Sequence, residues 1–251
     1  MITGELVLLK TSHRGKVREF IVKVSDEQLH TDFGIVELST LADKVPGDTV
    51  VAHKGQEFTI QRPKMPDFFR HAKRTGAPMM PKDIGMIIAY TGLSKNDVVL
   101  DAGTGSGILT MYLGSIAKRV VTYEVKEDFV KVARKNVENA GLDNVELRCG
   151  DIVEEINNIT DEKFDVITLD TQNTKDVIPN VRKVLHPGGF LATYSPFFEQ
   201  TKEIRDAMEA EGFYDVVTIE CTEREISFSA RGTRPSTTKV GHTGFITIAR
   251  A

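Results

Sequence analysis

The sequence predicts an α/β fold, with a mostly parallel sheet covered by helices on both faces and a small all-β domain in front of it. From residue 82 onward, apolar runs of strand length alternate with segments of helical periodicity. A glycine-rich turn at residues 103–107 joins one of these runs to the next helical segment. Residues 1–62 hold only short β-rich runs separated by turns, which indicates a separate β domain.

Residues 1–62 are expected to form the small β domain, and residues 63–82 a basic connector. The runs rich in Val, Ile, Leu and Phe cover 5–10, 16–24 and 49–60, with turns at Arg14-Gly15, Pro46-Gly47 and Lys54-Gly55. Four prolines punctuate the connector, and its middle, 67–74, can form a short helix.

Residues 83–251 are the third predicted part, in which strands and helices alternate. The expected strands are 97–101, 119–124, 144–149, 164–169, 189–194, 214–221 and 243–249. The expected helices are 83–91, 107–117, 127–140, 175–185 and 199–211, and 222–242 is expected to be a loop. This order predicts a mostly parallel seven-stranded sheet whose last two strands close one edge.

Residues suited to binding a ligand follow several of these strands. The 103–107 turn comes directly after the strand that ends at Asp101, and its glycines let the main chain approach a ligand because they have no Cβ. An acid ends or follows each of three later strands. These acids are Glu124, Asp151 and Asp170. Because the carboxyl ends of parallel strands line one crevice, the acids are expected to face the same ligand.

A glycine-rich turn alone fits a dinucleotide site, a phosphate site or a methyl-donor site, since all three use glycine for the same steric reason. Asp101, before the first glycine, favours a cationic ligand over a pyrophosphate. The turn also lacks the Gly-Lys-Ser/Thr ending of a phosphate-binding loop. The series from Asp101 to Asp170 resembles the S-adenosylmethionine site of the class I methyltransferases, which have a Rossmann-like fold.

Three further features narrow the resemblance. Pro81-Lys82-Asp83 begins the first expected helix, the connector carries Arg62-Pro63 and Phe68-Phe69, and the chain closes with 234–238 and Gly241-His242-Thr243-Gly244-Phe245. Together with the β domain, these segments make the chain similar over essentially its whole length to the tRNA (adenine-N1)-methyltransferases of archaea and bacteria. The resemblance implies methylation of a T-loop adenine at position 58, in some archaea its neighbour as well, and assembly as a homotetramer.

The resemblance also implies roles for individual residues. It makes Asp170 the catalytic carboxylate, Glu124 the acceptor of the ribose hydroxyls, and Asp151 the partner of the donor's adenine amino group. The implied donor-binding residues are Asp101, Gly103, Thr104, Gly105, Ser106, Gly107, Ile108, Leu109, Glu124, Val125, Asp151 and Asp170.

Two positions depart from the family's usual pattern. Thr171-Gln172-Asn173 stands where relatives carry an aliphatic residue or proline and then a further proline, and Met80 stands where many carry an aromatic residue or histidine. Both departures fall on the target-base side of the pocket, so they concern the substrate more than the donor.

The charge distribution indicates an RNA partner. Residues 1–75 hold 12 Lys and Arg against 10 Asp and Glu, or +2, whereas the remainder holds 20 against 26, or −6. Local basic patches on an acidic body can hold a phosphate backbone without binding every polyanion. The expected RNA-binding residues are Arg62, Lys64, Arg70, Lys73, Arg74, Arg231, Arg234 and Lys239.

Composition excludes several classes of protein. Cys149 and Cys221 lie in apolar stretches without the spacing of a metal site, so they are expected to be buried reduced thiols, and no metal is expected. No apolar run approaches the length of a membrane span and the amino terminus is polar, which predicts a cytoplasmic protein.

Two other functions stay open on the sequence alone. One is a methyltransferase that acts on protein isoaspartate or a small molecule, and the early β domain and basic connector argue against it. The other is a non-catalytic tRNA-binding subunit, against which the acids Asp101, Glu124 and Asp170 argue.

Overall fold

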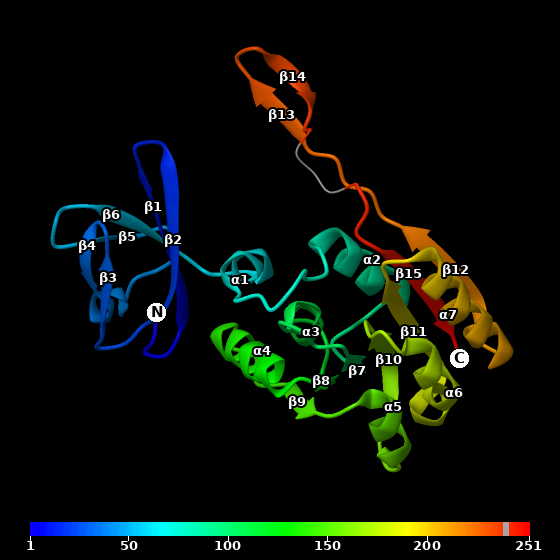
Figure 1. Cartoon of the computed structure of the whole chain (residues 1–251). Coiled ribbons are helices and arrows are strands. Elements are labelled where there is room, and N and C mark those ends of the chain that lie inside the picture. Colours follow the sequence, from blue (N-terminus) through cyan, green and yellow to red (C-terminus); the bar gives the residue numbers. More distant parts are fainter. Residues whose placement is uncertain (238–240) are drawn as a thin grey trace. The chain divides into compact units, whose positions relative to one another are not determined.

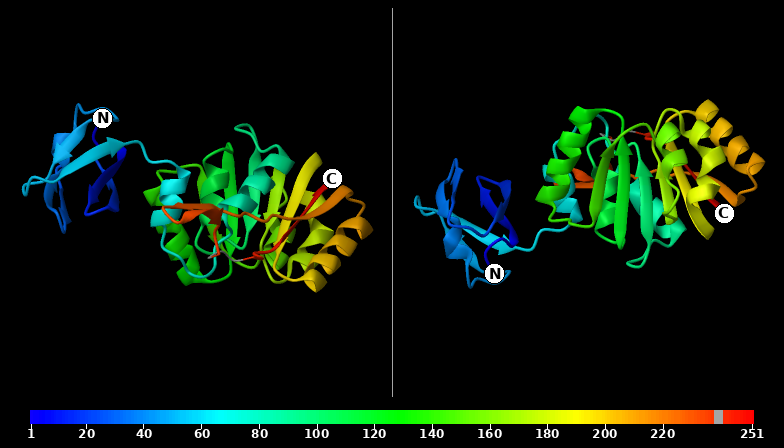
Figure 2. Two further views of the ribbon diagram at one scale, coloured as in Figure 1. Left: turned by 90° about the horizontal axis from the view of Figure 1, so that it is seen from above. Right: turned by 90° about the horizontal axis from the view of Figure 1, so that it is seen from below.

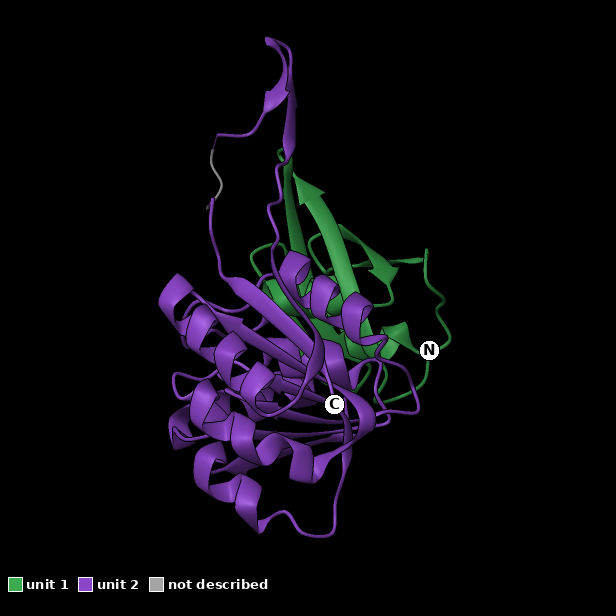
Figure 3. Ribbon diagram, turned by 90° about the vertical axis from the view of Figure 1, so that its right-hand side faces the viewer, with its two compact units in different colours: residues 1–71 green, residues 72–251 purple. Residues whose placement is uncertain are grey.

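The structure, a computed structural model, describes residues 1–237 and 241–251. It divides into two compact units, Met1–His71 and Ala72–Ala251, which Figure 3 shows in different colours. Each unit has a hydrophobic core of its own.

Unit 1 is built from two antiparallel sheets. A four-stranded sheet has the order β2-β1-β6-β5, and β3 and β4 form a two-stranded one. The strands are β1 (Leu6–His13), β2 (Lys16–Lys23), β3 (Gln28–Thr31), β4 (Gly34–Glu37), β5 (Thr49–Val51) and β6 (Glu57–Gln61). The helical elements are η1 (Leu38–Leu41) and α1 (Met65–His71). The predicted all-β character of this part is confirmed.

Details of unit 1 differ from the prediction. Strands β3 and β4 were not predicted, because each has only four residues and too few apolar positions to show an alternation. The run 49–60 forms two paired strands, β5 and β6, which are joined at the predicted Lys54-Gly55 turn. Helix α1 begins before the predicted residue 67, since the Asp67 carboxylate accepts a hydrogen bond from the Lys64 amide at 2.7 Å.

Unit 2 contains a seven-stranded sheet of order β12-β15-β11-β10-β7-β8-β9 (Figure 1). The strands are β7 (Val98–Ala102), β8 (Arg119–Glu124), β9 (Val145–Cys149), β10 (Phe164–Leu169), β11 (Leu185–Ser195), β12 (Tyr214–Glu220) and β15 (Phe245–Arg250). β15 pairs antiparallel with both β11 and β12, whereas the other neighbouring strands of this sheet pair in parallel, so the predicted mostly parallel sheet is confirmed.

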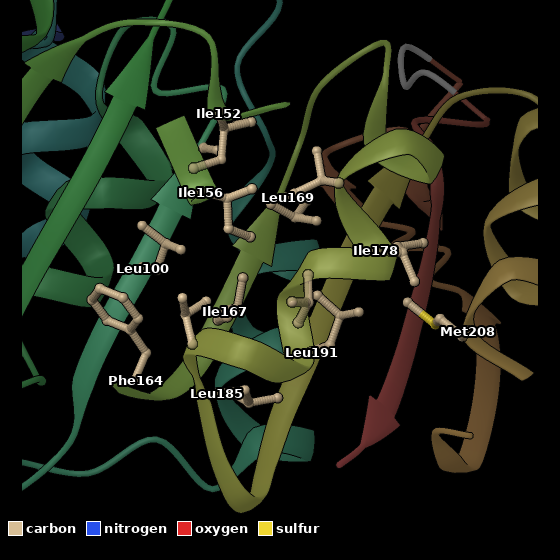
Figure 4. Close-up of a cluster of buried hydrophobic side chains, with 14 of the residues drawn as sticks. Leu100, Ile152, Ile156, Phe164, Ile167, Leu169, Ile178, Leu185, Leu191 and Met208 are labelled. Carbon is tan, nitrogen blue, oxygen red and sulfur yellow. The ribbon is translucent and has the colours of Figure 1, made fainter. Parts of the chain in front are cut away.

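Helices cover both faces of this sheet (Figure 2). They are α2 (Pro81–Thr91), α3 (Ile108–Gly114), α4 (Glu127–Asn139), α5 (Ile152–Glu155), η2 (Ile156–Asn158), α6 (Thr174–Val184) and α7 (Phe198–Ala210). Helices α2, α3 and α4 contact one another in sequence, whereas α6 packs against α5, η2 and α7. Between α6 and the sheet lies a cluster of fully buried side chains that includes Phe164, Ile167 and Leu191 (Figure 4).

The expected loop over 222–242 is wrong. Within it, β13 (Ile226–Ser229) and β14 (Gly232–Pro235) pair as an antiparallel hairpin. Every residue of both strands is exposed, so the sequence lacks the buried alternating face that identifies a strand. Only Ile226 and Phe228 carry an alternation, and it is too short to stand out.

Candidate functional site

A cavity of about 430 Å³ lies at the carboxyl ends of β7, β8 and β10. The strand order reverses between β7 and β10, and ligands of open α/β sheets bind at such a point. The volume is that of a small-molecule site. The cavity is lined by residues 75–79, 103–106, 108–109, 123–126, 129, 150–152 and 170–173.

The glycine turn is forced against the end of β10. Gly103 has φ +90°, and a Cβ there would stand 2.0 Å from the carbonyl oxygen of Asp170 and 2.7 Å from its carbon. No side chain fits between these two backbones. Gly107 has φ +78° at the start of α3, where a Cβ would meet Ala133 at 3.1 Å. The sequence therefore needs glycine at both positions, for steric reasons that are independent of any ligand.

Glu124, the last residue of β8, is buried and holds the same turn from the other side. Its Oε2 accepts a hydrogen bond from the Gly105 amide at 2.9 Å, and its Oε1 accepts one from the Lys126 amide at 3.0 Å. The carboxylate lines the cavity. Each oxygen of a carboxylate can accept more than one hydrogen bond, so Glu124 keeps acceptor capacity for a ligand.

Asp101 lies behind the turn and does not line the cavity. Its carboxylate accepts hydrogen bonds from the hydroxyls of Thr110, Thr122 and Thr168 at 2.8, 2.8 and 2.6 Å. Burial raises the pKa of Asp101, and these three hydrogen bonds act in the opposite direction. Asp101 thus ties β7, β8, β10 and α3 together beneath the cavity floor.

Asp170, directly after β10, differs from the other acids. Its backbone amide donates to Ala102 at 2.8 Å, but among the described residues no group donates a hydrogen bond to its carboxylate. Burial, together with the nearby charge of Asp101, raises the pKa of Asp170 to about 7. A partly buried carboxylate with a raised pKa and no internal partner, at the wall of a cavity, is a candidate for chemistry.

The remaining predicted donor-binding residues also reach the cavity, apart from Gly107. Thr104, Ser106, Ile108, Leu109 and Val125 line it, as does Asp151, whose carboxylate caps α5 by accepting from the Val153 amide at 2.9 Å.

Sequence reasoning missed the segment 75–79, which forms one wall. Asn136 of α4 fastens the chain just before it: its amide donates to the carbonyls of Lys73 and Ser106, both at 2.8 Å, and its Oδ1 accepts from the Lys73 amide at 3.0 Å. The Thr75 amide also donates to the Ser106 hydroxyl at 3.1 Å. A lone Asn in a helical pattern gives no sequence signal for this role.

The cavity wall formed by Thr171, Gln172 and Asn173 coincides with the unusual run after the candidate catalytic acid. Gln200 of α7 donates to the carbonyls of Thr171 and Gln172 at 3.4 and 3.3 Å, and Thr174 donates to the Thr171 carbonyl at 2.8 Å. These hydrogen bonds restrict the backbone of residues 171–173, as prolines restrict the backbone of a loop that contains them.

Comparisons with known proteins agree with this geometry. A family profile described as "Methyltransferase domain" matches residues 93–237, more than half of the chain. The protein named tRNA (adenine(57)-N(1)/adenine(58)-N(1))-methyltransferase TrmI from Methanocaldococcus jannaschii is 38% identical, over 96% of this chain and 94% of its own length. The chain belongs to the tRNA (adenine-N1)-methyltransferase family. Another member, a TrmI of Thermus thermophilus, is 30% identical over 88% of each chain.

Solved structures confirm the class I methyltransferase fold with β strands in front. A protein described as a SAM-dependent O-methyltransferase from Thermotoga maritima has a TM-score of 0.79 and 28% identity, covering 100% of this chain and 94% of its own. The tRNA (m1A58) methyltransferase TrmI of Aquifex aeolicus has a TM-score of 0.73 at 24% identity, covering 100% and 98%.

The basic residues that the sequence predicts to bind RNA are found in both units. In unit 1, Arg62 is 3.9 Å from Glu5, and Arg70 is 3.2 Å from Glu19, so both cations have carboxylate partners. Lys64 is also in unit 1, while Lys73 and Arg74 begin unit 2. Arg231 and Arg234 are exposed on the β13–β14 hairpin, and Lys239 lies outside the described residues.

The cysteine prediction needs correction. Cys149 is exposed and Cys221 is partly buried, because each ends or follows a strand at the surface rather than lying in its middle. Across residues 1–237 and 241–251, no group of three or more His, Cys, Asp or Glu side chains could hold a metal ion. In the same ranges, no helix is both long and apolar enough to cross a membrane.

The raised pKa of Asp170 predicts a cost in stability. Its carboxyl is neutral in the folded chain up to about pH 7, whereas in the unfolded chain it ionises near 3.8. The stability lost through Asp170 therefore grows from pH 4 to pH 7 and stays constant above. Asp170→Asn is expected to stabilise the donor-free protein by up to about 4 kcal/mol above pH 7, with the gain vanishing towards pH 4.

Urea unfolding at several pH values measures this gain. Asp165→Asn is the matched control, since Asp165 lies near the opposite end of the same strand and accepts from the Val98 amide at 2.8 Å. A gain for Asp170→Asn that does not depend on pH would contradict the assignment of the buried, raised-pKa carboxyl.

Proposed function

We propose that this protein transfers the methyl group of S-adenosylmethionine to N1 of an adenine in the tRNA T-loop. The observation that carries the proposal is the partly buried carboxylate of Asp170, which lines the cavity beside the glycine turn and accepts no hydrogen bond from the described residues. Kinship supports it, since the M. jannaschii relative, named for adenines 57 and 58, matches nearly the whole chain.

The cavity fits a cationic methyl donor better than a nucleotide pyrophosphate. Its described lining carries three acids against one base. The acids are Glu124, Asp151 and Asp170, and the base is Lys126. The apolar side chains of Ile108, Leu109 and Phe129 offer contact for a purine ring. In our proposal Glu124 accepts from the ribose hydroxyls, Asp151 accepts from the adenine amino group, and the 103–106 backbone lies along the methionine end.

In the proposed reaction, the main task of the protein is to place a negative charge beside the purine that becomes positively charged. When bound, S-adenosylmethionine supplies an electrophilic methyl group on a sulfonium. The N1 lone pair of the target adenine lies in the plane of the ring and can attack directly, which leaves a positive charge on the purine. Asp170 accepts a hydrogen bond from the exocyclic amino group, enriches N1 in electron density and stabilises that cation. Removal of the amino proton would add general-base character.

The substrate must open its structure before transfer. N1 lies on the Watson–Crick edge, and a T-loop base has to be extruded to reach a cavity of this size, at a cost of a few kcal/mol. Phosphate contacts to exposed arginines can offset that cost. We assign the hairpin residues Arg231 and Arg234 to this role.

The finer parts of the proposal follow from the family. We propose methylation at position 58, with position 57 as a second target, and a homotetramer that works in the cytoplasm, where its tRNA substrate is found. The exposed Ile226 and Phe228 of the hairpin offer an apolar face that a second subunit can cover. The likeness to a T. maritima protein described as an O-methyltransferase keeps an oxygen acceptor as the alternative, which product analysis separates.

Asp170→Asn tests the catalytic role. A neutral amide accepts a hydrogen bond more weakly and cannot offset the purine cation, so single-turnover transfer from labelled donor to tRNA should fall by roughly 10²–10⁴. Affinity for tRNA should stay close to that of the wild type. Asp165→Asn should keep near-normal rates, and equal rates in the two variants would reject the role of Asp170.

Neutralising the hairpin tests the RNA surface. Arg231→Gln with Arg234→Gln should weaken binding to all tRNAs and flatten the plot of log affinity against log salt by about 0.7–0.9 per lost phosphate contact. Lys175→Gln with Lys202→Gln removes two cations from α6 and α7 and is the control. If both double variants keep the wild-type slope, the hairpin does not hold phosphates.

A further inference from the structure

The chain leaves the sheet of unit 2 after β12 and returns before β15. We call this excursion, in its described residues 221–237 and 241–242, the arm. It carries the β13–β14 hairpin, which stands away from the sheet (Figure 1). All hairpin residues are exposed within the single chain, with Phe228 at 79%, so packing of the hairpin against its own chain does not fix its position. The described contacts within the chain that hold the arm lie where it joins the sheet.

Lys82, in the first turn of α2, joins both ends of the arm. Its ammonium group donates to the carbonyl oxygen of Cys221 at 2.6 Å, where the arm begins, and to the Thr243 hydroxyl at 2.7 Å, where the arm ends. The third bond goes to Asp83 Oδ1 at 2.7 Å. The Thr243 hydroxyl in turn donates to Asp83 Oδ2 at 2.9 Å. We call Lys82, Asp83, Cys221 and Thr243 the clasp.

The clasp is closed and almost dry. The Asp83 side chain is 0% exposed and that of Lys82 12%. An ammonium group has three protons, and all three are used. A buried ion pair contributes little net stability compared with apolar packing, and its best-attested use is to specify one arrangement of the chain. Here the pair holds the two ends of the arm, at Cys221 and Thr243, next to each other.

His242 makes a second set of contacts at the two ends of the arm. His242 Nδ1 lies 2.6 Å from Glu220 Oε1, and its Nε2 lies 2.9 Å from the carbonyl oxygen of Pro196. Both partners are acceptors, so both bonds exist together only when the imidazole is protonated. These contacts raise the pKa of His242, which the nearby Lys82 cation opposes. Glu220 is the last residue of β12 and Pro196 follows β11, so these contacts again join the arm to the sheet.

The clasp is close in sequence to one wall of the cavity, although its own residues are not among those that line it. Pro78 and Met79, which line the cavity, precede the α2 turn that carries Lys82. On the other side, Gly244 follows the clasp threonine, and a Cβ there would stand 2.4 Å from the ring of Tyr194. Tyr194 belongs to β11, which pairs with β10, and Asp170 directly follows β10.

We propose that Lys82 and Thr243 are positioning residues, which fix the arm relative to the cavity so that a tRNA held by the arm presents its base to Asp170. The proposal rests on the proposed function for its substrate. None of the four clasp residues is among the residues that line the cavity, so loss of the clasp should affect the use of tRNA and leave donor binding unchanged.

Thr243→Val tests the clasp with the least damage. It is isosteric and keeps both charges, but removes the hydroxyl that links Lys82 to Asp83. We expect kcat/KM for tRNA to fall by about tenfold, with donor affinity by calorimetry within about twofold of the wild type. Thr243→Ser, which keeps the hydroxyl, should recover most of the loss. Thr247→Val is the control. It makes the same substitution at a buried threonine of β15, whose hydroxyl bonds the Thr218 hydroxyl at 3.0 Å instead of a clasp residue.

Hydrogen exchange of the full-length chain gives a readout without substrate. Thr243→Val should speed amide exchange in 220–222 and 243–245 relative to wild type, while Thr247→Val should not do so selectively. Lys82→Met with Asp83→Asn, which leaves no lone buried charge, should reproduce the Thr243→Val pattern. Equal effects of the two valine variants on tRNA use and exchange would overturn the proposal. A wild type inactive on tRNA rejects the proposed function instead, and the exchange data still decide the clasp.

Discussion

The approach of the glycine turn to the end of β10 is the constraint on which the site depends. At Gly103 the two backbones are so close that a Cβ would overlap the Asp170 carbonyl. This contact sets the turn and the candidate catalytic acid side by side at the point where the strand order reverses. Any larger residue at position 103 would push the glycine turn away from Asp170. The proposed donor site and the proposed catalytic acid therefore depend on the same close contact.

The three acids around this contact differ in the hydrogen bonds that they accept. Asp101 receives three threonine hydroxyls and supports the floor. Glu124 receives two backbone amides and orders the turn while it faces the cavity. Asp170 receives no hydrogen bond from the described residues and has a pKa of about 7. The Asp170 carboxylate can therefore accept hydrogen bonds from a substrate. Its charged form lowers the stability of the folded chain, whereas its neutral form does not.

Local patterns in the sequence predicted the elements around the site well. Buried strands such as β7 and β10 are short apolar runs, the glycine turn and the acids stand at their ends, and all are read from neighbouring residues. The Asn136 contacts and the clasp could not be read in this way, because Lys82 meets partners 139 and 161 residues away. The hairpin was missed for another reason: it buries nothing, so its pattern of apolar residues carries no periodic signal.

Nucleoside mass spectrometry of tRNA incubated with this protein and S-adenosylmethionine tests the central claim most directly. The account predicts a gain of N1-methyladenosine in unmodified tRNA transcripts, and its absence when Asp170 is replaced by Asn. A wild-type product methylated at any atom other than adenine N1, or no methylated nucleoside at all, would contradict it.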